Sequence, residues 1–282
     1  MKIGAIIQAR TGSTRLPNKV LMDLPYNSGI TVLSQDIRRI KSSKYLDDII
    51  IATTTNNEDD KIVEVAVSEN VKCFRGSEKD VLKRYYDAAK QNNIDVIVRF
   101  TSDCPCMDGE IIDKVILEYL DDPSYDFVAT VLERTFPIGL DVEVIKFSAL
   151  EKAYKNAEED YQREHVSDYI YENPDIFKLR NVKAGKEYNE PLFRITLDTN
   201  EDYMMLCAIY DYLYENNIYF SAKEVVDLIR KKPWIQFINN RSLQKKDSMT
   251  LQEELSEAEK LLEIQGLKRA KEILLKNGSL GV

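Results

Sequence analysis

The amino-acid sequence predicts an α/β fold in which helices cover both faces of a mostly parallel sheet. In the first 100 residues, short apolar runs of strand length alternate with longer amphipathic stretches of helix length. The apolar runs are continuous, which is typical of strands that are buried on both faces. The segments between them are polar and carry Gly, Ser, Thr and Pro. This strand-helix alternation favours parallel strands with helical crossovers.

The first half contains four expected strands, at residues 2–7, 48–53, 71–75 and 96–100. Helices are expected between them at 31–42, 59–70 and 80–92. Ligands of such sheets bind at the carboxyl ends of the strands. The loops that follow Ile7, Ala52, Phe74 and Phe100 are therefore the candidate functional loops.

The second half is expected to add shorter elements and a separate C-terminal extension. Strands are expected at 126–130, 140–145 and 192–197, and helices at 111–120, 148–155, 163–172, 201–216 and 221–231. A polar, basic stretch at 241–248 reads as a linker, which divides the chain into domains at 1–240 and 241–282. Leu251, Leu255, Leu262 and Leu274 then recur at roughly helical spacing, interrupted by Gly266. They predict a helical hairpin that either packs on the core or binds a partner.

The composition and net charge restrict the classes of function that the chain can have. The chain has 282 residues, of which 44% are hydrophobic and 31% charged, and its net charge is -9. An acidic balance disfavours nucleic-acid binding but allows a local basic pocket for a small anion. The four cysteines match no zinc spacing, which indicates free thiols in a reducing compartment. Neither a signal peptide nor an apolar run of roughly 20 residues is recognisable, so we expect a cytoplasmic protein without membrane segments.

The loop at residues 8–19 combines cations with small, flexible residues. Arg10, Arg15 and Lys19 flank Gly12 and Ser13. A nucleoside triphosphate carries about four negative charges, and its binding loop needs cations together with backbone N–H groups. The pattern is neither a Walker loop nor a dinucleotide fingerprint. Spacing alone leaves two interpretations open, a triphosphate-binding loop and a basic surface loop.

Two aspartates follow expected strands at the ligand edge of the sheet. Asp103 follows the strand at 96–100, and Asp198 ends the one at 192–197. A carboxylate placed there is a natural Mg²⁺ ligand beside a triphosphate. The alternatives are structural: an N-cap or Asx turn for Asp103, and an N-cap with Glu201 in a capping box for Asp198.

Weaker signals lie in two further segments. Asp141 and Glu143 alternate along one strand and form either an acid–base pair or a solvated face. His165, the only histidine, follows Arg163. Because no nucleophile accompanies this histidine, an anion-binding pocket or a structural role fits it better than nucleophilic catalysis.

Taken together, these segments resemble the cytidylyltransferases of the spore-coat polysaccharide biosynthesis protein F type. That group is related to the synthetases that load CMP onto 3-deoxy-manno-octulosonate and sialic acids. The matching segments run in order from residue 1 to about 240. They are residues 7–21, 74–82, 98–105, 139–144, 163–166 and 197–202.

The resemblance implies a Rossmann-like nucleotidyltransferase fold, a three-layer sandwich, and a homodimer. It implies Mg²⁺ on Asp103 and Asp198, and catalytic roles for these two and for Arg10, Arg15 and Lys19. The residues that it places near the nucleotide are Gln8, Ala9, Arg10, Gly12, Ser13, Lys19, Thr53, Arg75, Ser77, Thr101 and Asp103. Those that it places near the acceptor are Asp141, Glu143, Arg163, His165 and Arg194.

The implied reaction transfers CMP from CTP to a small acidic acceptor, with release of pyrophosphate. A sugar of the nonulosonate or octulosonate type is expected, and a phosphorylated or phosphonate acceptor is the alternative. A nucleotide-sugar-dependent glycosyltransferase of similar fold is disfavoured, because its Asp-x-Asp motif is here Asp103-Cys104-Pro105. Two positions depart from the family: Ser102 replaces a usual Gly, and Asn200 a usual Pro. Thr196 stands where sialate-type members carry a second aspartate, so one aspartate from each of two segments is expected instead.

Overall fold

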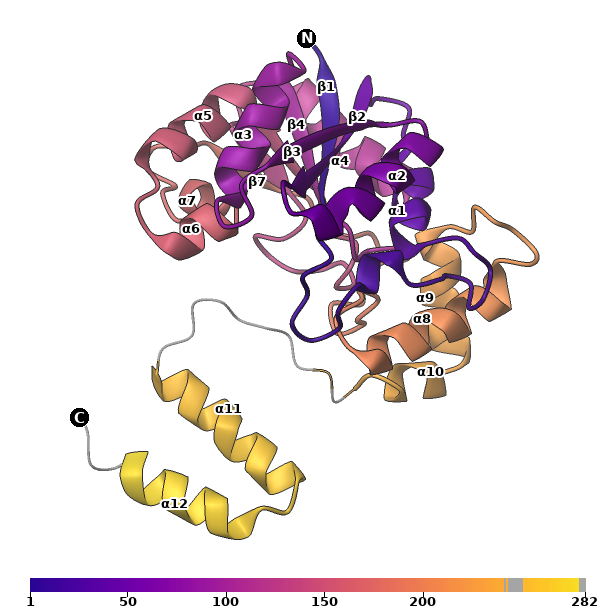
Figure 1. The fold of residues 1–282 in the computed structure, drawn as a ribbon, viewed down its shortest axis with the longest axis vertical. Coiled ribbons are helices and arrows are strands. Elements are labelled where there is room, and N and C mark those ends of the chain that lie inside the picture. Colours follow the sequence, from indigo (N-terminus) through magenta and orange to yellow (C-terminus); the bar gives the residue numbers. More distant parts are fainter. Residues whose placement is uncertain (241, 243–250, 279–282) are drawn as a thin grey trace. The chain divides into compact units, whose positions relative to one another are not determined.

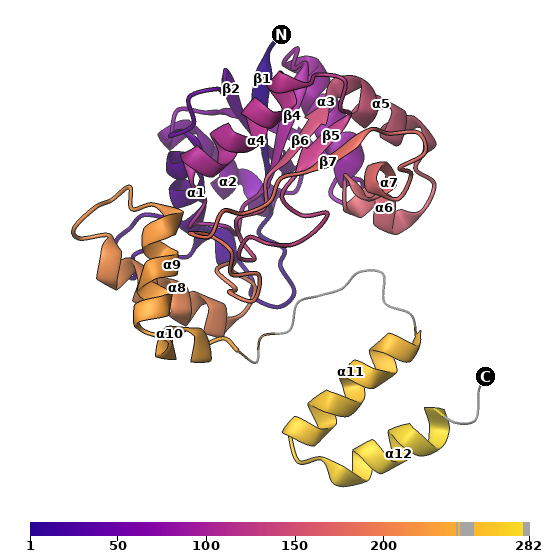
Figure 2. The ribbon, with the colours of Figure 1, turned by 180° about the vertical axis from the view of Figure 1, so that it is seen from behind.

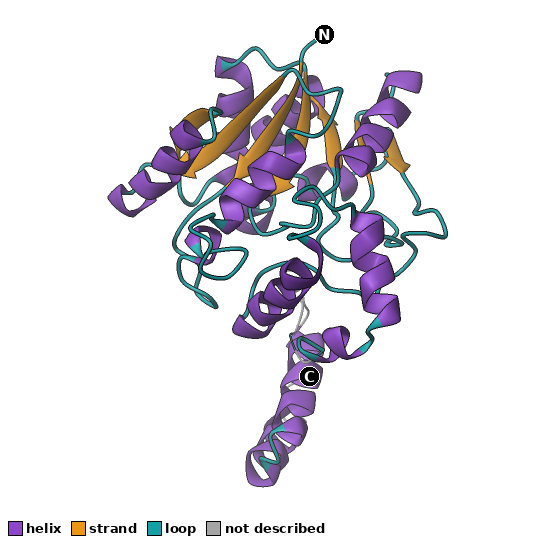
Figure 3. Ribbon diagram, turned by 90° about the vertical axis from the view of Figure 1, so that its right-hand side faces the viewer, coloured by secondary structure: helices purple, strands orange, loops and turns teal. Residues whose placement is uncertain are grey.

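The computed structural model describes residues 1–240, 242 and 251–278. They form two compact units, residues 1–242 and 243–282. The first holds a seven-stranded sheet between two layers of helices (Figure 1, Figure 3). Its strands are β1 (Ile3–Gln8), β2 (Asp48–Thr54), β3 (Lys72–Gly76), β4 (Val96–Thr101), β5 (Phe127–Ala129), β6 (Glu143–Lys146) and β7 (Leu179–Asn181). The predicted α/β sandwich is confirmed.

The strand order is β3-β2-β1-β4-β6-β5-β7. β1 pairs in parallel with both β2 and β4, whereas β6 runs antiparallel to its neighbours β4 and β5. The sheet is thus mostly parallel, as predicted. The chain builds outward from β1 through β2 to β3, then returns to the other side of β1 with β4. The order reverses between β1 and β4, and such switch points open a crevice at the carboxyl ends of the strands.

Alternating side chains of β1 point into two separate cores, as the pleat of a strand requires. Ala5 and Ile7 pack in the core under α1, α2 and α4, and Ile6 packs in the core under α3 and α5. Both sides of the strand are buried, which explains its continuous apolar sequence.

Figure 2 shows the two helical layers from behind. The helices of the first unit are α1 (Val32–Ile40), α2 (Asp60–Ser68), α3 (Val81–Gln91), α4 (Gly109–Asp121), α5 (Phe147–Asn156), α6 (Asp160–Glu164), α7 (Asp168–Tyr171), α8 (Asn200–Leu213), α9 (Ala222–Lys231) and α10 (Trp234–Phe237), with 3-10 turns η1 (Lys19–Leu21) and η2 (Asn57–Asp59).

Three of the predictions about elements are wrong. The expected strand at 192–197 is a loop segment with one isolated bridge, from Arg194 to Ile138. The side chains of Phe193, Ile195 and Leu197 are buried, whereas Leu192 is exposed. The backbone of the segment bonds to loops, for example from Leu197 N–H to the Asp103 carbonyl at 2.8 Å. The expected helix at 163–172 is broken between α6 and α7, where Val166 has φ 45°. The expected strand at 140–145 is shortened to β6, so Asp141 lies outside the sheet.

The edge strand β7 and the one-turn helix α10 were not predicted. β7 has three residues and α10 has four, which is too short for a hydrophobic period to develop.

The second unit contains α11 (Leu251–Ile264) and α12 (Lys268–Gly278), which contact each other. Gly266, with φ 67°, forms the turn between them. The expected linker at 241–248 lies outside the described residues, except for Ser242. No described helix is long and apolar enough to cross a bilayer, and all four cysteines are free thiols.

Candidate active site

The loop after β1 is held by a buried carboxylate. Asp59 accepts hydrogen bonds from the N–H of Thr11 at 2.8 Å and from its hydroxyl at 2.7 Å. The Thr11 carbonyl in turn accepts from the N–H groups of Ser13 and Asn18. Asn18 adopts a left-handed conformation, φ 58°, just before η1. This turn fixes where η1, and therefore Lys19, begins.

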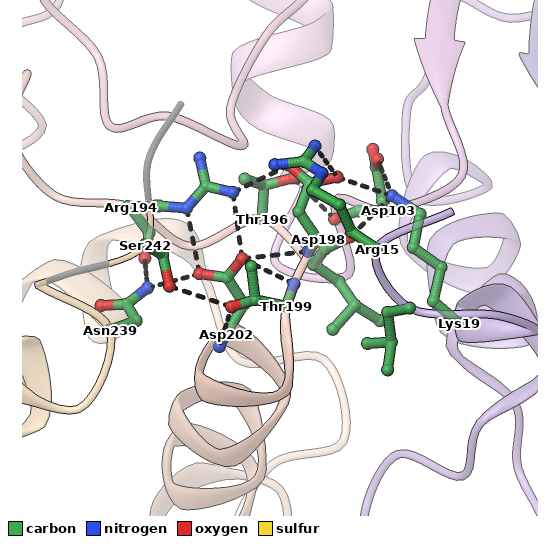
Figure 4. A network of polar contacts seen from close by, with 12 residues as sticks. Arg15, Lys19, Asp103, Arg194, Thr196, Asp198, Thr199, Asp202, Asn239 and Ser242 are labelled. Carbon is green, nitrogen blue, oxygen red and sulfur yellow. Dashed lines mark hydrogen bonds and ion pairs between the residues drawn. The ribbon is translucent and has the colours of Figure 1, made fainter. Parts of the chain in front are cut away.

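Lys19 joins the loop to both predicted metal-binding aspartates (Figure 4). Its Nζ lies 2.6 Å from Oδ2 of Asp103, 2.9 Å from Oδ1 of Asp198 and 2.7 Å from the Leu197 carbonyl oxygen. Two carboxylates from distant segments thus meet at one cationic centre. Burial disfavours the ammonium, but attraction to the two carboxylates outweighs it and raises the pKa of Lys19.

Neither aspartate is the N-cap of a helix, which was one structural alternative for Asp103 and the structural alternative for Asp198. The N-cap of α4 is Asp108. The N-cap of α8 is Thr199, which forms a capping box with Asp202. The carboxylates of Asp103 and Asp198 are therefore directed into the site instead of closing a helix end.

Asp198 is surrounded by cations. Arg15 lies 2.9 Å from Oδ1, the oxygen that also contacts Lys19, and Arg194 lies 2.8 Å from Oδ2. Burial opposes the charge of Asp198. Attraction to Lys19 and hydrogen bonds from Lys19 and Arg194 outweigh burial and lower its pKa to about 2. The carboxylate is therefore ionised at neutral pH and able to bind a metal ion.

Arg194 is a structural part of this network. It is buried and makes two bonds of 3.0 Å to Asp202, which is itself fully buried. Asn239 donates both to Asp202 at 2.9 Å and to the Arg194 carbonyl at 3.0 Å. Its guanidinium is bonded to both Asp198 and Asp202, so Arg194 holds Asp198 in place. The acceptor-binding role of Arg194 stays a prediction.

The donor set fits Mg²⁺ that is shared with a nucleotide. No group of three or more potential protein ligands occurs among the described residues, so the protein itself offers the two carboxylates Asp103 and Asp198. Mg²⁺ is commonly held by one or two carboxylates together with substrate phosphates. The site therefore suits a metal–phosphate complex better than a free metal ion.

A second group of predicted residues lines a cleft of about 480 Å³ next to the loop. Arg10 and Arg163, one from each of two predicted subsites, both lie there. Arg163 is bonded to Asp80 and to the Tyr154 carbonyl. The full lining is Arg10, Glu78, Lys79, Asp80, Asp160, Arg163 and Glu164. The Glu and Asp side chains near the two arginines were not predicted. They could have been found from the sequence because they lie within the matching segment 74–82, or within or beside the segment 163–166.

Several predicted nucleotide-binding residues lie at the carboxyl ends of neighbouring strands. Gln8 ends β1 and pairs with Thr101 of β4, while Thr53 lies near the end of β2. The side-chain oxygens of Gln8 and Thr53 are buried and have no hydrogen-bond partner among the described residues. Ala9 is buried beside them, and its N–H bonds to the Ala52 carbonyl.

The other predicted nucleotide-binding side chains belong to loops. A Cβ added to Gly12 would meet only Glu78, at 4.0 Å, so the backbone there is open. Ser13 Oγ accepts from the Leu16 N–H at 3.4 Å, and Ser77 Oγ from the Asp80 N–H at 3.0 Å. Arg75 bonds to Asp60 and to the carbonyls of Thr54 and Asn56, which orders the loop after β2.

The remaining predicted acceptor residues do not converge on one point. Asp141 pairs with Arg134 at 2.7 Å, whereas Glu143 is buried and pairs with Arg99 at 2.6 Å. The two carboxylates therefore have different cation partners and do not form one solvated face. His165 caps α6, its N–H bonding to the Tyr161 carbonyl at 2.8 Å.

A mostly parallel sheet with a cationic loop and two aspartates at its switch point fits a nucleotidyltransferase of the α/β class. The comparisons with known proteins agree with this assignment. A family model described as cytidylyltransferase matches residues 4–273. The chain belongs to the cytidylyltransferase family.

Individual relatives and structures extend this result. A Methanocaldococcus jannaschii protein, MJ1063, is 45% identical over 87% of this chain and 97% of its own length. Spore coat polysaccharide biosynthesis protein SpsF of Bacillus subtilis is 33% identical over 81% of this chain and 94% of its own. The structure of a cytidylyltransferase from Leptospira borgpetersenii is 38% identical, with a TM-score of 0.79, and covers 87% of this chain and 100% of its own.

Proposed function

We propose that the chain is a CTP- and Mg²⁺-dependent cytidylyltransferase that transfers CMP to an acidic sugar for cell-surface polysaccharide or glycan synthesis. The observation that carries this proposal is the meeting of Asp103 and Asp198 at Lys19, on the loop after β1. One cation and two carboxylates from three segments are assembled at the switch point. That arrangement suits a triphosphate with its metal ion.

In the proposed reaction, an acceptor oxygen attacks the α-phosphorus of CTP, and the bond from that phosphorus to the bridging oxygen breaks. Pyrophosphate leaves, and no covalent enzyme intermediate is needed. Mg²⁺ held by Asp103 and Asp198 would neutralise charge at the α-phosphate. Arg10, Arg15 and Lys19 would stabilise the charge that develops on the departing pyrophosphate.

An acidic acceptor is inferred from Arg10 and Arg163, which share one cleft with Lys79 and four carboxylates. The proximity of this cleft to the loop would bring a carboxylate of an octulosonate or nonulosonate within reach of a cation. A phosphorylated or phosphonate acceptor would use the same cations, and it is the second candidate. The similarity to SpsF, a spore coat polysaccharide biosynthesis protein, supports a role in surface polysaccharides. The cytoplasmic location of the protein and its assembly into a homodimer stay predictions.

Pyrophosphate release, measured with each nucleoside triphosphate and a panel of acceptors, tests this proposal. We expect pyrophosphate release only when CTP, Mg²⁺ and a keto-acid sugar are all present. Release with a phosphorylated or phosphonate acceptor alone would favour the second candidate. Hydrolysis of a nucleotide sugar, without pyrophosphate, would indicate a glycosyltransferase and contradict the proposal.

A further inference from the structure

The protein itself supplies hydrogen-bond acceptors for the Lys19 ammonium group, without any phosphate. This ammonium has three oxygen acceptors within 2.9 Å, and the Lys19 side chain is 12% exposed. Both aspartates place one oxygen on this nitrogen. The ammonium therefore occupies the point at which the two carboxylates converge.

The three cations around Asp198 differ in how firmly the fold holds them. Arg194 is fixed, because Asp202 and Asn239 anchor it within the protein. Lys19 and Arg15 come from the loop after β1, and the Arg15 side chain is 37% exposed. Arg194 would keep Asp198 oriented if the two loop cations moved to another anion.

The charge balance of the site favours movement of Lys19 and Arg15 away from Asp198 only when a phosphate binds. Three cations, Lys19, Arg15 and Arg194, match three carboxylates, Asp103, Asp198 and Asp202. A divalent cation added to this neutral cluster would have to displace the ammonium from both carboxylates. A triphosphate offers Lys19 new acceptors at the same time, which lowers the cost of that displacement.

We propose that Lys19 is a built-in counter-ion that closes the metal site until a nucleotide triphosphate draws it away. The inference rests on the proposed function, since it takes the triphosphate to be the anion that receives Lys19. Free divalent metal then binds weakly, and metal and nucleotide bind cooperatively. By linkage, each raises the affinity for the other by the same factor.

The test measures binding of Mn²⁺, a paramagnetic substitute for Mg²⁺, to the full chain without nucleotide or acceptor. The variants are Lys19→Met and Lys19→Gln, compared with wild type and with Arg10→Met. Arg10 belongs to the same loop but makes no ion pair with either aspartate in the described part of the chain. Arg10→Met therefore controls for the loss of one positive charge from this loop.

We expect Lys19→Met and Lys19→Gln to bind Mn²⁺ alone at least about tenfold more tightly than wild type and Arg10→Met. With no cation between them, two carboxylates attract a divalent ion more strongly. The thermal unfolding midpoint gives a second reading, because a bound metal raises it. Mn²⁺ should raise this midpoint more in the Lys19 variants than in Arg10→Met.

Binding of CTP to wild type, measured with and without Mn²⁺, separates the two proposals. If Mn²⁺ tightens CTP binding but the Lys19 variants bind Mn²⁺ no better than wild type, the counter-ion proposal alone is overturned. If CTP binding to wild type is independent of Mn²⁺ and no pyrophosphate is released in the assay above, the proposed function fails and the counter-ion role fails with it.

Discussion

The carboxylate of Asp59 holds Thr11 by both its backbone N–H and its hydroxyl, at 2.8 and 2.7 Å. Asp59 is 2% exposed and also accepts a hydrogen bond from the Thr54 hydroxyl. One buried side chain thus ties the loop after β1 to the end of β2. The loop that carries Lys19 therefore depends on a residue outside every motif that the sequence singled out.

Asp59→Asn should lower stability in a pH-dependent way. Burial raises the pKa of Asp59, but hydrogen bonds from Thr54 and Thr11 outweigh it and hold the pKa below the usual 3.8. A lowered pKa adds stability above about pH 3.8, which is lost as pH falls through the folded-state value. We expect a loss of about 1–3 kcal/mol at pH 7 that shrinks below pH 3.8.

Urea unfolding of wild type and Asp59→Asn between pH 3 and 7 measures this difference. Asp60→Asn is the control, because that carboxylate is 58% exposed in its pair with Arg75. A deficit for Asp59→Asn that stays constant across the whole range would contradict the assigned hydrogen-bond role.

Arg194→Met should destabilise the fold by about 3–5 kcal/mol, since it leaves the fully buried Asp202 without its cation. Asp202→Asn in the same chain should restore part of that loss, because it removes the uncompensated charge. Urea unfolding of the single and double variants measures both effects. A stable Arg194→Met protein with only a raised KM for the acceptor would instead support the acceptor-binding role that the sequence suggested.

Features that depend on local periodicity could be predicted from the sequence. The buried strands β1, β2 and β4 were recognisable because two-sided burial makes their sequences continuously apolar. Asp103 could be placed at the ligand edge because it directly follows such a strand. The position of Asp198 was predicted for a partly wrong reason, since the segment before it alternates like a strand but bonds to loops.

Features that depend on tertiary partners were not predictable. Nothing in the local sequence of Arg194 shows that Asp202 and Asn239 enclose it, because Asn239 lies 45 residues away along the chain. The alternation of Asp141 and Glu143 suggested one shared face, yet Arg134 and Arg99 separate them. Pairing between remote charged side chains decides such roles, and periodicity carries no information about it.

Asp103→Asn should reduce CTP-dependent pyrophosphate release by at least about a hundredfold while the protein stays folded, since the amide cannot supply the carboxylate charge for a metal ion. The control is Asp141→Asn, which removes a carboxylate from a pair whose partners are each 32% exposed. We expect this control to keep stability within about 0.5 kcal/mol of wild type. Near-normal release by Asp103→Asn at saturating CTP would refute its metal-binding role.

Gly139 controls the segment that carries Asp198. Its φ is 105°, and an added Cβ would lie 2.8 Å from the Ile195 carbonyl oxygen. Its neighbour Ile138 exchanges backbone hydrogen bonds of 2.8 Å with Phe193 and Ile195. A side chain at residue 139 would therefore push this segment, and Asp198 with it, away from Lys19.

Gly139→Ala should cost about 2–5 kcal/mol from backbone strain and steric overlap together, and should lower kcat at least about tenfold. Gly29→Ala isolates the backbone term, because Gly29 also has positive φ, 72°, but its Cβ would meet nothing within 4 Å. That variant should lose only about 1–2 kcal/mol and keep its kcat. Urea unfolding and pyrophosphate release give the two readings. Equal losses of stability and of kcat in both variants would show that contact with Ile195 does not position Asp198.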